Sequence, residues 1–416
     1  MSQKNPYIKS KDQPKSGGGR GILPGAGKKV VVAMSGGVDS SVAALLLKNQ
    51  GYEVVGIALQ TTDYTKYRDD AGEGGSGNCC SIKDMEEARR VAEIIGIPFY
   101  VLDTEKAFDS QVVNYFVNEY IQGRTPNPCV VCNTKVKFNH LYKKAMDMGA
   151  DFVATGHYAK LSNEPDLGYV LWKSTDQAKD QTYFLFNLTQ NQLFKTLFPI
   201  GHLTKPEVRR LALEHKLPVA EKPDSQEICF VPGNDYAGFI SKRVSPSLVK
   251  YGFIITKDQK VITNHEGIHH YTVGQRKGLG GAINMAKLMA MENADDFYVT
   301  AIDPIKAHVV VGPSQDLMKW GLLCNHVNWI VPPDLRKARR LQVKIRHRAE
   351  MAECEVRMLG DSQCEVRFEK AQRAITPGQA CVFYDGNMCL GGGWISEILD
   401  VEIQDRVKPR DQLQSL

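Results

Sequence analysis

Two glycines, an aspartate and three serines stand together between an apolar run and the start of a predicted helix. The stretch reads Ser35-Gly36-Gly37-Val38-Asp39-Ser40-Ser41 and follows the apolar residues 30–34. Paired glycines let the backbone approach an anion, and a helix N-terminus directs N–H groups and partial positive charge at it. Ser40 and Ser41 are placed to cap the helix and to donate hydroxyl hydrogen bonds. The pattern predicts a phosphate-binding loop, and the plainer alternative is an ordinary strand-to-helix turn.

A second glycine-rich stretch, Gly25-Ala26-Gly27-Lys28, does not have the spacing of a Walker loop. No serine or threonine follows Lys28, and the stretch precedes the predicted strand, whereas a Walker loop follows its strand. The missing loop lysine argues against ordinary hydrolysis of a γ-phosphate.

Three cysteines lie in settings that favour reactivity. Cys129 and Cys132 form a Cys-x-x-Cys after the proline-bearing residues 125–128, with Lys135 and Lys137 close behind, and Cys229 stands in a polar stretch just after Pro223. A thiol near a helix start or near lysines is shifted towards the thiolate, which is the nucleophilic form. These cysteines are therefore candidates for reactive thiols.

Zinc binding and simple burial are the alternatives for the Cys-x-x-Cys. A structural zinc site needs four ligands, and the other cysteines offer no second pair at suitable spacing. Cys79 and Cys80 adjoin, and Cys354 and Cys364 are ten residues apart. Ten cysteines in a chain without an apolar export signal predict reduced thiols in a reducing, cytoplasmic compartment.

The elements that must position these residues alternate between strands and helices. Apolar runs predict strands over 30–34, 54–59, 98–102 and 152–155, and helices over 42–50 and about 85–95 lie between them. Strands that alternate with helices predict an α/β fold, a doubly wound parallel sheet with helices on both faces. We place this nucleotide-binding and catalytic domain at residues 28–225.

The pattern changes after Pro223. Residues 226–295 form a mixed central domain, whose glycine-rich stretch 271–280 suits a tight loop. In residues 296–416, short alternating segments separated by turn residues predict a small C-terminal antiparallel β-barrel. The predicted strands are 297–302, 308–311, 341–346, 354–358, 364–368 and 380–384.

Composition sets only broad limits. Hydrophobic residues make up 43% and charged residues 24% of 416 residues, as in globular proteins, and the formal charge is only +5. That charge permits an anionic partner without requiring one. No apolar run approaches the length that spans a bilayer, so we expect no membrane partner. The Lys-, Gly- and Ser-rich residues 1–27 predict a disordered basic tail, with an organelle-targeting peptide as the alternative.

The loop at 35–41 resembles that of the ATP pyrophosphatase superfamily, whose fold is of the adenine nucleotide α-hydrolase type. With the cysteines included, the chain resembles the tRNA-specific 2-thiouridylase family along almost its whole length after residue 28. No single motif carries this resemblance; the order and joint presence of the matching stretches do. They are 33–42, 123–138, 154–160 (Ala-Thr-Gly-His-Tyr-Ala-Lys), 179–185, 198–201, 224–231 and 271–280.

The resemblance implies ATP-dependent 2-thiolation of the wobble uridine of tRNA. ATP adenylates the oxygen at C2 of the base, which makes it a good leaving group, and sulfur from a protein persulfide then displaces AMP. Carried over by position, Cys229 would hold the persulfide and Cys132 would be the nucleophile, ending in a Cys132–Cys229 disulfide. A cysteine desulfurase or sulfur-relay protein would donate the sulfur, and tRNAs for Lys, Glu and Gln are the family's substrates.

The resemblance also implies the cofactor residues. Those that match ATP-contacting positions are Ala33, Met34, Ser35, Gly36, Gly37, Val38, Asp39, Ser40, Leu59 and Gly156, with Asp39 expected to organise Mg²⁺ or the phosphates. Some family members carry Asp where this chain has Cys129, and that Asp is a proposed general base. Cys129 is therefore a substitute base or a third thiol. An iron–sulfur cluster on Cys129, Cys132 and Cys229 is a further hypothesis.

Other positions match family contacts to tRNA: Asn127, Pro128, Cys129, His157, Lys179, Asp180, Gln181, Arg346, His347 and Gln379. From composition alone, His157 could be a buried histidine at a strand end and 179–181 a surface triplet. The clearest charge cluster is 336–348, where Leu341 and Val343 alternate with Gln342 and Lys344. One face of this strand is predicted to be apolar and the other to lie along phosphates, or simply in solvent.

Two other classes of function compete with a tRNA thiolase. A small-molecule ligase that uses ATP, like GMP synthetase or argininosuccinate synthase, would leave the basic barrel strand and the Cys132–Cys229 pair without a role. A non-catalytic RNA-binding or sulfur-carrier protein would leave the loop at 35–41 unexplained. The fold alone does not separate these classes.

Overall fold

The structure is a computed structural model, and it describes residues 23–61, 82–224, 227–292, 294–334 and 338–400. Most of the predicted tail, Cys79, Cys80, Ser225, Gln226, Arg336 and Lys337 lie outside the described residues. The chain divides into two compact units: unit 1 holds 1–114, 128–235 and 387–390, and unit 2 holds 115–127, 236–386 and 391–416. No helix within the described ranges is long and apolar enough to cross a membrane.

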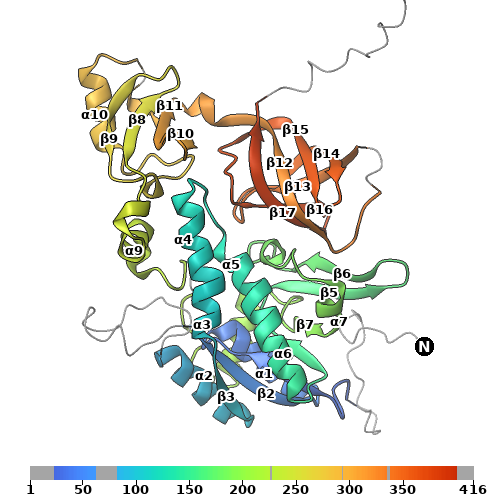
Figure 1. Ribbon diagram of the computed structural model, residues 1–416. Helices are drawn as coiled ribbons and strands as arrows, with labels where there is room; N and C mark the ends of the chain where they lie inside the picture. Colours follow the sequence, from blue (N-terminus) through green and yellow to red (C-terminus); the bar gives the residue numbers. More distant parts are fainter. Residues whose placement is uncertain (1–22, 62–81, 225–226, 293, 335–337, 401–416) are drawn as a thin grey trace, which may run out of the picture. The chain divides into compact units, whose positions relative to one another are not determined.

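A parallel sheet of five described strands forms the centre of unit 1 (Figure 1). Its order is β3-β2-β1-β4-β7, and each neighbouring pair runs parallel. The central strands are almost fully buried because both faces are covered, which explains their continuous apolar sequence. The strands are β1 (Lys29–Ala33), β2 (Glu53–Gln60), β3 (Phe99–Asp103), β4 (Phe152–Ala154) and β7 (Thr196–Leu197).

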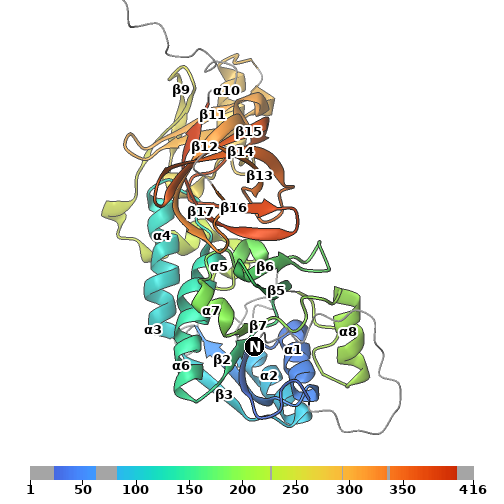
Figure 2. The ribbon, with the colours of Figure 1, turned by 90° about the vertical axis from the view of Figure 1, so that its right-hand side faces the viewer.

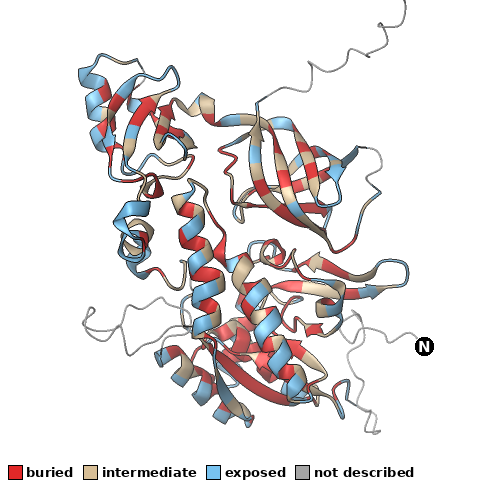
Figure 3. Cartoon of the chain, viewed as in Figure 1, coloured by how far each residue is buried: buried red, intermediate tan, exposed pale blue. Residues whose placement is uncertain are grey.

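Helices cover both faces of this sheet. Helix α1 (Val38–Asn49) packs against α2 (Ile82–Ile95) and α8 (Lys205–Glu214), and α6 (Tyr142–Asp147) packs on β4. Figure 2 shows α1 and α8 on the side of the sheet opposite α6. Buried residues concentrate in the sheet and in the inward faces of these helices (Figure 3). The predicted doubly wound α/β fold is confirmed.

The remaining elements of unit 1 join or flank the sheet. A hairpin of β5 (Ala159–Glu164) and β6 (Gly168–Lys173) pairs with Met388 and Cys389, which belong to the same unit. The helical elements are α3 (Glu105–Phe108), η1 (Asp109–Val113), α5 (Pro128–Val131), η2 (Cys132–Leu141), η3 (Thr182–Phe184), α7 (Gln190–Phe194) and η4 (Pro232–Asn234), and α4 (Asn114–Ile121) begins at the end of the first segment of unit 1.

Unit 2 contains a four-stranded sheet in the order β10-β11-β8-β9, counted over its described residues. Its core includes Ile254, Val299 and Val309, and α10 packs against β9. The segment 115–127 belongs to this unit: the ring of Tyr120 stacks on that of Tyr236 with centroids 5.0 Å apart. The elements are α9 (Tyr236–Arg243), η5 (Pro246–Leu248), β8 (Gly252–Thr256), β9 (Val261–His265), η6 (Ile268–His270), α10 (Gly280–Leu288), η7 (Ala294–Asp296), β10 (Tyr298–Asp303) and β11 (His308–Gly312).

Six described strands close into an antiparallel barrel in the order β12-β15-β14-β13-β16-β17, and pairing of β12 with β17 completes the ring. The inward residues are apolar or cysteine and almost fully buried, as alternation along each strand requires. The elements are η8 (Ser314–Leu317), β12 (Met318–Trp329), β13 (Arg339–Lys344), β14 (Ala352–Gly360), β15 (Gln363–Arg373), β16 (Ala380–Asp385) and β17 (Met388–Leu399).

The predicted barrel is thus confirmed, but the sequence prediction missed two of its strands. β12 and β17 were not predicted because each contains glycines or polar residues that interrupt simple alternation, in the stretches 318–329 and 388–399. The prediction instead placed β10 and β11, at 298–303 and 308–312, in the barrel, and the structure places them in the four-stranded sheet. Glycine-rich residues 271–279 form turns, as expected.

Candidate active site

Three neighbouring strands end at the same edge of the parallel sheet, and the predicted ATP-contacting residues lie there. From β1 the chain continues to β2 and β3 on one side of the sheet, and β4 lies on the other side of β1. The strand order therefore reverses between β1 and β4. Ligands of open α/β sheets bind at such a point, beyond the carboxyl ends of the strands. Ala33 ends β1 and residues 34–40 follow it, Leu59 lies near the end of β2, and Gly156 follows β4.

The two loop glycines have different surroundings. Gly36 has a φ of +71°, and a Cβ there would stand 2.2 Å from the carbonyl oxygen of Asp84 in α2. Gly37 is extended, with φ −96° and ψ 161°, and a Cβ on it would meet nothing closer than the Ser35 hydroxyl at 3.7 Å. The conformation of the loop therefore requires glycine at position 36, whereas the space beside Gly37 remains open for an anion.

The predicted helix cap is wrong. Helix α1 begins at Val38, four residues earlier than expected, and its N-cap is Gly37, without a side-chain hydrogen bond. Ser40 and Ser41 lie inside the first turn, and both hydroxyls donate to the carbonyl oxygen of Gly37, at 3.2 and 2.8 Å. The Ser40 hydroxyl also accepts from the backbone N–H of Ser35. The serines thus close the loop on itself and leave the helix N-terminus uncapped by side chains.

Gly156 fits the start of α1 because it has no side chain. A Cβ at this position would stand 2.5 Å from the backbone nitrogen of Ser40 and 2.6 Å from the carbonyl carbon of Asp39. The strand end after β4 therefore packs directly on the loop that follows β1, and any larger residue would push the two apart.

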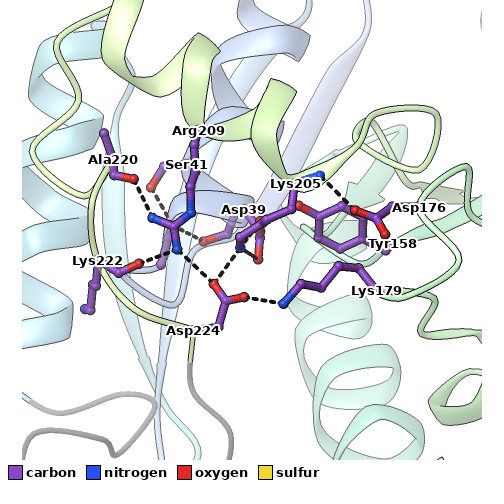
Figure 4. A network of polar contacts seen from close by, with 12 residues as sticks. Asp39, Ser41, Tyr158, Asp176, Lys179, Lys205, Arg209, Ala220, Lys222 and Asp224 are labelled. Carbon is purple, nitrogen blue, oxygen red and sulfur yellow. Dashed lines mark hydrogen bonds and ion pairs between the residues drawn. The ribbon is translucent and has the colours of Figure 1, made fainter. Parts of the chain in front are cut away.

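A network of charged side chains surrounds Asp39 (Figure 4). The Lys205 ammonium, at the start of α8, donates to both carboxylate oxygens of Asp39 at 2.8 Å and pairs with Asp224 at 2.7 Å. The Tyr158 hydroxyl also donates to Asp39, at 2.8 Å. Burial and the Asp39 carboxylate raise the pKa of Tyr158, so its hydroxyl stays protonated and donates. Lys205 is only 7% exposed.

Asp224 pairs with three cationic side chains. Besides Lys205, Lys179 pairs with it at 2.7 Å and Arg209 donates to it at 3.4 Å. Burial alone would raise the pKa of Asp224, but the hydrogen bonds from Lys179 and Lys205 outweigh it and lower the pKa. The carboxylate is therefore ionised at neutral pH, and the cations around it are held in place.

A second cluster ties the loop to α2. The Lys222 ammonium donates to the carbonyl oxygen of Gly36 at 2.9 Å and to the carboxylates of Asp84 and Glu87. Burial lowers the pKa of Lys222, but the hydrogen bonds that its ammonium donates to the two carboxylates raise the pKa above its ordinary value. Sequence reasoning missed Tyr158, Lys205, Arg209 and Lys222. For all of these but Arg209, the partners lie far away in the chain; Lys205 and Asp39 are 166 residues apart.

Cys129 and Cys132 lie in the first two turns of a helical run that starts at Pro128 and continues through η2 and α6. Proline is favoured at a first helical position because the N–H it lacks would have no helical partner. Cys129 is exposed and Cys132 is half-buried. Cys129 thus stands at the N-terminal end of a helix, where the partial positive charge favours a thiolate.

Cys229 is half-buried and lies in a turn of the segment that follows Asp224. Its neighbour Phe230 packs edge-on against Phe108 at the end of α3, with ring centroids 5.6 Å apart. The segments that carry the other two cysteines pack on this same region. Cys129 lies in α5, which contacts η1, and Cys132 lies in η2, which contacts both α3 and η1. The segments that carry Cys132 and Cys229 therefore share one neighbour, the α3–η1 turn of unit 1.

The described residues form no metal site of their own: none of their His, Cys, Asp and Glu side chains gather in groups of three that could hold an ion. Cys129, Cys132 and Cys229 are thus not arranged as cluster ligands here, and the iron–sulfur hypothesis has no support from this geometry. The Asp39 carboxylate is occupied by Lys205 and Tyr158. We therefore assign no residue to Mg²⁺.

The tRNA-contacting residues expected in unit 1 are mostly bound to the protein itself. Asp180 is buried and accepts from the backbone of Ser174 and the hydroxyl of Thr182. Gln181 exchanges hydrogen bonds with the backbone of Tyr158, and Lys179 pairs with Asp224. These contacts hold the three residues in place within unit 1, and their contact with tRNA stays a prediction.

His157 follows Gly156 and lies among aromatic rings. Its Nδ1 is 2.7 Å from the hydroxyl of Thr155, and its ring lies 6.3 Å from those of Phe138 and Phe198. Burial, and next the nearby Lys137, hold the pKa of His157 well below its usual value, so the ring is neutral at pH 7. Pro128 is buried as well.

In unit 2, two of the residues that were expected to contact tRNA donate hydrogen bonds to other parts of the same unit. Arg346 donates to the carbonyl oxygen of Ala374 and to the Thr376 hydroxyl. The amide of Gln379 donates to the carbonyls of Thr125 and Pro126, just before Asn127, which is largely buried. His347 is half-buried.

Strand β13 has the predicted two faces. Leu341, Val343 and the following Ile345 are buried, while Gln342 and Lys344 are half-buried on the other face, beside the exposed Arg339 and Arg340. Arg339 pairs with Asp385 and Arg340 with Glu369, and contact of Lys344 with phosphates stays a prediction.

Comparison with known proteins agrees with this arrangement. Residues 28–233 match the family model of the tRNA methyl transferase HUP domain, 238–313 that of the tRNA methyl transferase PRC-barrel domain, and 319–395 that of the aminomethyltransferase β-barrel domain. The parallel sheet with its glycine loop at the reversal point thus defines a nucleotide-binding domain of the HUP class.

Curated relatives narrow this class. A tRNA-specific 2-thiouridylase of Geotalea uraniireducens is 49% identical over 90% of this chain and 96% of its own length. Enzymes of the same name from Geobacter metallireducens and Clostridioides difficile are 48% and 46% identical, each over 89% of this chain and over 97% and 99% of their own lengths. The chain therefore belongs to the tRNA-specific 2-thiouridylase family.

Proposed function

We propose that this protein replaces the C2 oxygen of the wobble uridine of tRNA with sulfur, at the expense of ATP. One observation carries the proposal: a phosphate-type loop and the segments of Cys132 and Cys229 belong to the same compact unit, with both cysteine segments packed on the α3–η1 turn. A small-molecule ligase has no use for the two cysteines, and a sulfur carrier has no use for the loop.

In the first step, the C2 oxygen of uridine attacks the α-phosphorus of ATP and pyrophosphate leaves. The open backbone at Gly37 and the N-terminus of α1 would hold the phosphates, because both offer N–H groups without side-chain competitors. Adenylation is needed because an amide-like oxygen is otherwise a poor leaving group. Any Mg²⁺ would enter with ATP.

In the second step, sulfur attached to Cys229 as a persulfide reaches C2. In one route, the Cys132 thiolate attacks the Sγ of Cys229 and releases hydrosulfide, which attacks C2 and expels AMP. In the other, the terminal sulfur of the persulfide attacks C2 and expels AMP, and Cys132 then attacks Cys229 to free 2-thiouridine. Both routes end in a Cys132–Cys229 disulfide, which an external dithiol must reduce. Cys129, exposed at the helix start, is a candidate base in either route.

The sulfur donor would be a cysteine desulfurase or a relay protein that loads Cys229. The substrate tRNAs would be those for Lys, Glu and Gln, as in the family. A compartment that keeps thiols reduced, such as the cytoplasm, suits a catalytic cycle that passes through a disulfide.

The test is reconstitution. The purified protein is incubated with ATP, unmodified tRNA, a cysteine desulfurase, cysteine and a dithiol, and the digested nucleosides are analysed by mass spectrometry. We expect 2-thiouridine and AMP in equal amounts from the wild type, and none above background from Cys229→Ser or Asp39→Ala. Wild-type protein that releases AMP without forming 2-thiouridine would contradict the proposal.

Arg210→Met is the matched control, because Arg210 is an exposed cation of α8 paired only with Glu214 among the contacts described. It should retain wild-type thiolation. Leaving out ATP from the wild-type reaction should abolish the product, which separates the enzyme from a carrier that merely passes sulfur on.

A further inference from the structure

Two cationic side chains, Arg209 and Lys222, connect the segment just before Cys229 to its neighbours. Residues 220–224 run from the end of the α8 region towards Cys229. Arg209 donates to the carbonyl oxygens of Ala220 at 2.7 Å and Lys222 at 2.9 Å. Lys222 in turn reaches the carbonyl of Gly36 in the loop. The segment thus lies between α8 and the nucleotide loop.

Lys205 makes the central connection. Its single ammonium contacts Asp39, which belongs to the loop, and Asp224, which precedes Cys229 by five residues. It also lies 5.8 Å from the ring centre of Tyr158, whose hydroxyl donates to the same Asp39. Lys205 is buried, so its charge is strongly attracted to both carboxylates. Without it, Asp224 would keep Lys179 and Arg209, but Asp39 would lose its ion pair and the link between the two carboxylates would be gone.

We infer that Lys205 is a positioning residue that ties the segment carrying Cys229 to the nucleotide loop, through Asp224 on one side and Asp39 on the other. The inference rests on the proposed function for its catalytic meaning: by fixing Asp224, five residues before Cys229, Lys205 limits how far the sulfur of Cys229 can move from the nucleotide loop. Lys205 itself touches neither sulfur nor base in this role. It acts through Asp224.

Removal of Lys205 should loosen the segment locally. The backbone amides of Ala220, Lys222 and Val231 donate to carbonyls three residues earlier, which makes them reporters of local opening. In Lys205→Met, hydrogen exchange in peptides covering 219–224 and 227–231 should become roughly tenfold faster, because a buried ionic tie is lost. Exchange in β1 and α2 should change far less.

Two further variants keep the test decisive if Lys205→Met folds poorly. Asp224→Asn removes only the charge of the partner and should raise exchange in the same peptides by a smaller factor. Lys205→Arg keeps the charge and should recover most of the protection. Arg210→Met, a cation of the same helix outside the network, should exchange like wild type.

The catalytic consequence is measured separately. In the reconstituted reaction, Asp224→Asn should lower kcat for thiolation several-fold while the KM for ATP changes little, because Asp224 holds the sulfur-bearing segment. Loss of general stability would not produce this split. The exchange measurement needs no thiolation activity, so the tie can be judged even if the proposed function fails.

Wild-type exchange rates at 219–224 and 227–231 in folded Lys205→Met and Asp224→Asn would overturn the inference. So would an equal acceleration in Arg210→Met, since the effect would then belong to α8 as a whole. Active wild-type enzyme together with unchanged exchange in the variants would refute the tie alone and leave the proposed function standing.

Discussion

Three cysteines of unit 1 and four cysteines of the barrel are the same residue in opposite surroundings. Cys129 is exposed and Cys132 and Cys229 are half-buried, close to helix starts and turns. In the barrel, Cys324, Cys354, Cys364 and Cys381 are fully buried, and Cys324 stands opposite Cys364 on adjoining strands β12 and β15. Composition cannot separate the two groups, but their surroundings do.

Burial predicts low reactivity for the barrel cysteines. It raises the pKa of Cys324 well above its ordinary value and also raises those of Cys354 and Cys381. For Cys364 the largest cause is its hydrogen bond with Cys324, followed by burial, and both raise the pKa. A thiol that cannot ionise is neither a nucleophile nor a metal ligand. Four neighbouring cysteines in the barrel therefore serve as small core residues.

The largest expected effect is in chemical labelling. With iodoacetamide on the folded protein at pH 8, we expect Cys129, Cys132 and Cys229 to react at least about 10³-fold faster than the barrel cysteines, whose exposure requires global opening. Peptide mass spectrometry over time measures each rate. Guanidinium should remove the difference, and fast labelling of Cys364 in folded protein would break the comparison.

A second test compares two loop glycines, of which Gly36 is closely packed and Gly37 faces open space. Gly36→Ala should destabilise the protein by about 2–4 kcal/mol, because it combines a left-handed φ with overlap on Asp84. Gly37→Ala should cost less than about 1 kcal/mol but weaken ATP binding about tenfold, because its methyl enters the open space of the loop. Urea denaturation and calorimetric titration with ATP give the two values. Equal stability of both variants would contradict this reading.

A third test turns to the barrel core. Cys364→Ala should lower the free energy of unfolding by about 1–2 kcal/mol, since it leaves a small cavity among buried side chains. Thiolation by the surviving folded protein should stay within about twofold of wild type. Cys132→Ala should show the reverse, with activity lost and stability retained. Loss of activity in folded Cys364→Ala would assign the barrel cysteines a chemical role.

The smallest expected effect concerns the cationic face of β13. Lys344→Gln should weaken tRNA binding about threefold and reduce the slope of log affinity against log salt by about 1, because one phosphate contact is lost. Filter binding at several salt concentrations measures both. Arg346→Gln, by contrast, should also lower stability, because Arg346 holds Ala374 and Thr376. An unchanged salt dependence in Lys344→Gln would show that this face lies in solvent.

Local patterns in the sequence were enough to predict the sheet, the loop and the barrel class. The apolar run 30–34 and the glycines after it are contiguous, so β1 and its loop could be read directly. The hairpin strand Ala159–Glu164 could not, because its residues include few apolar ones and do not alternate cleanly. Leu341 and Val343 alternate with polar residues, so the two faces of β13 were predictable.

The sequence did not reveal ion pairs between residues that are far apart in the chain. Lys205 reads as an ordinary start of a helix with a capping box at Thr204 and Glu207, and nothing near it points to Asp39. The same holds for Lys222 and Asp84, which are 138 residues apart. Ionic networks of this kind depend on tertiary packing, which a single sequence does not display.

The path of the chain through the two units has a consequence for dissection and inheritance of the protein. Unit 1 is discontinuous: residues 115–127 belong to unit 2, and residues 387–390 return to unit 1, where Met388 and Cys389 pair with β6. A gene fragment ending near residue 235 would leave β6 without this neighbour and expose its backbone edge to aggregation. Unit 1 is thus not a contiguous module, and we expect it to fold properly only when residues 387–390 are synthesised along with it.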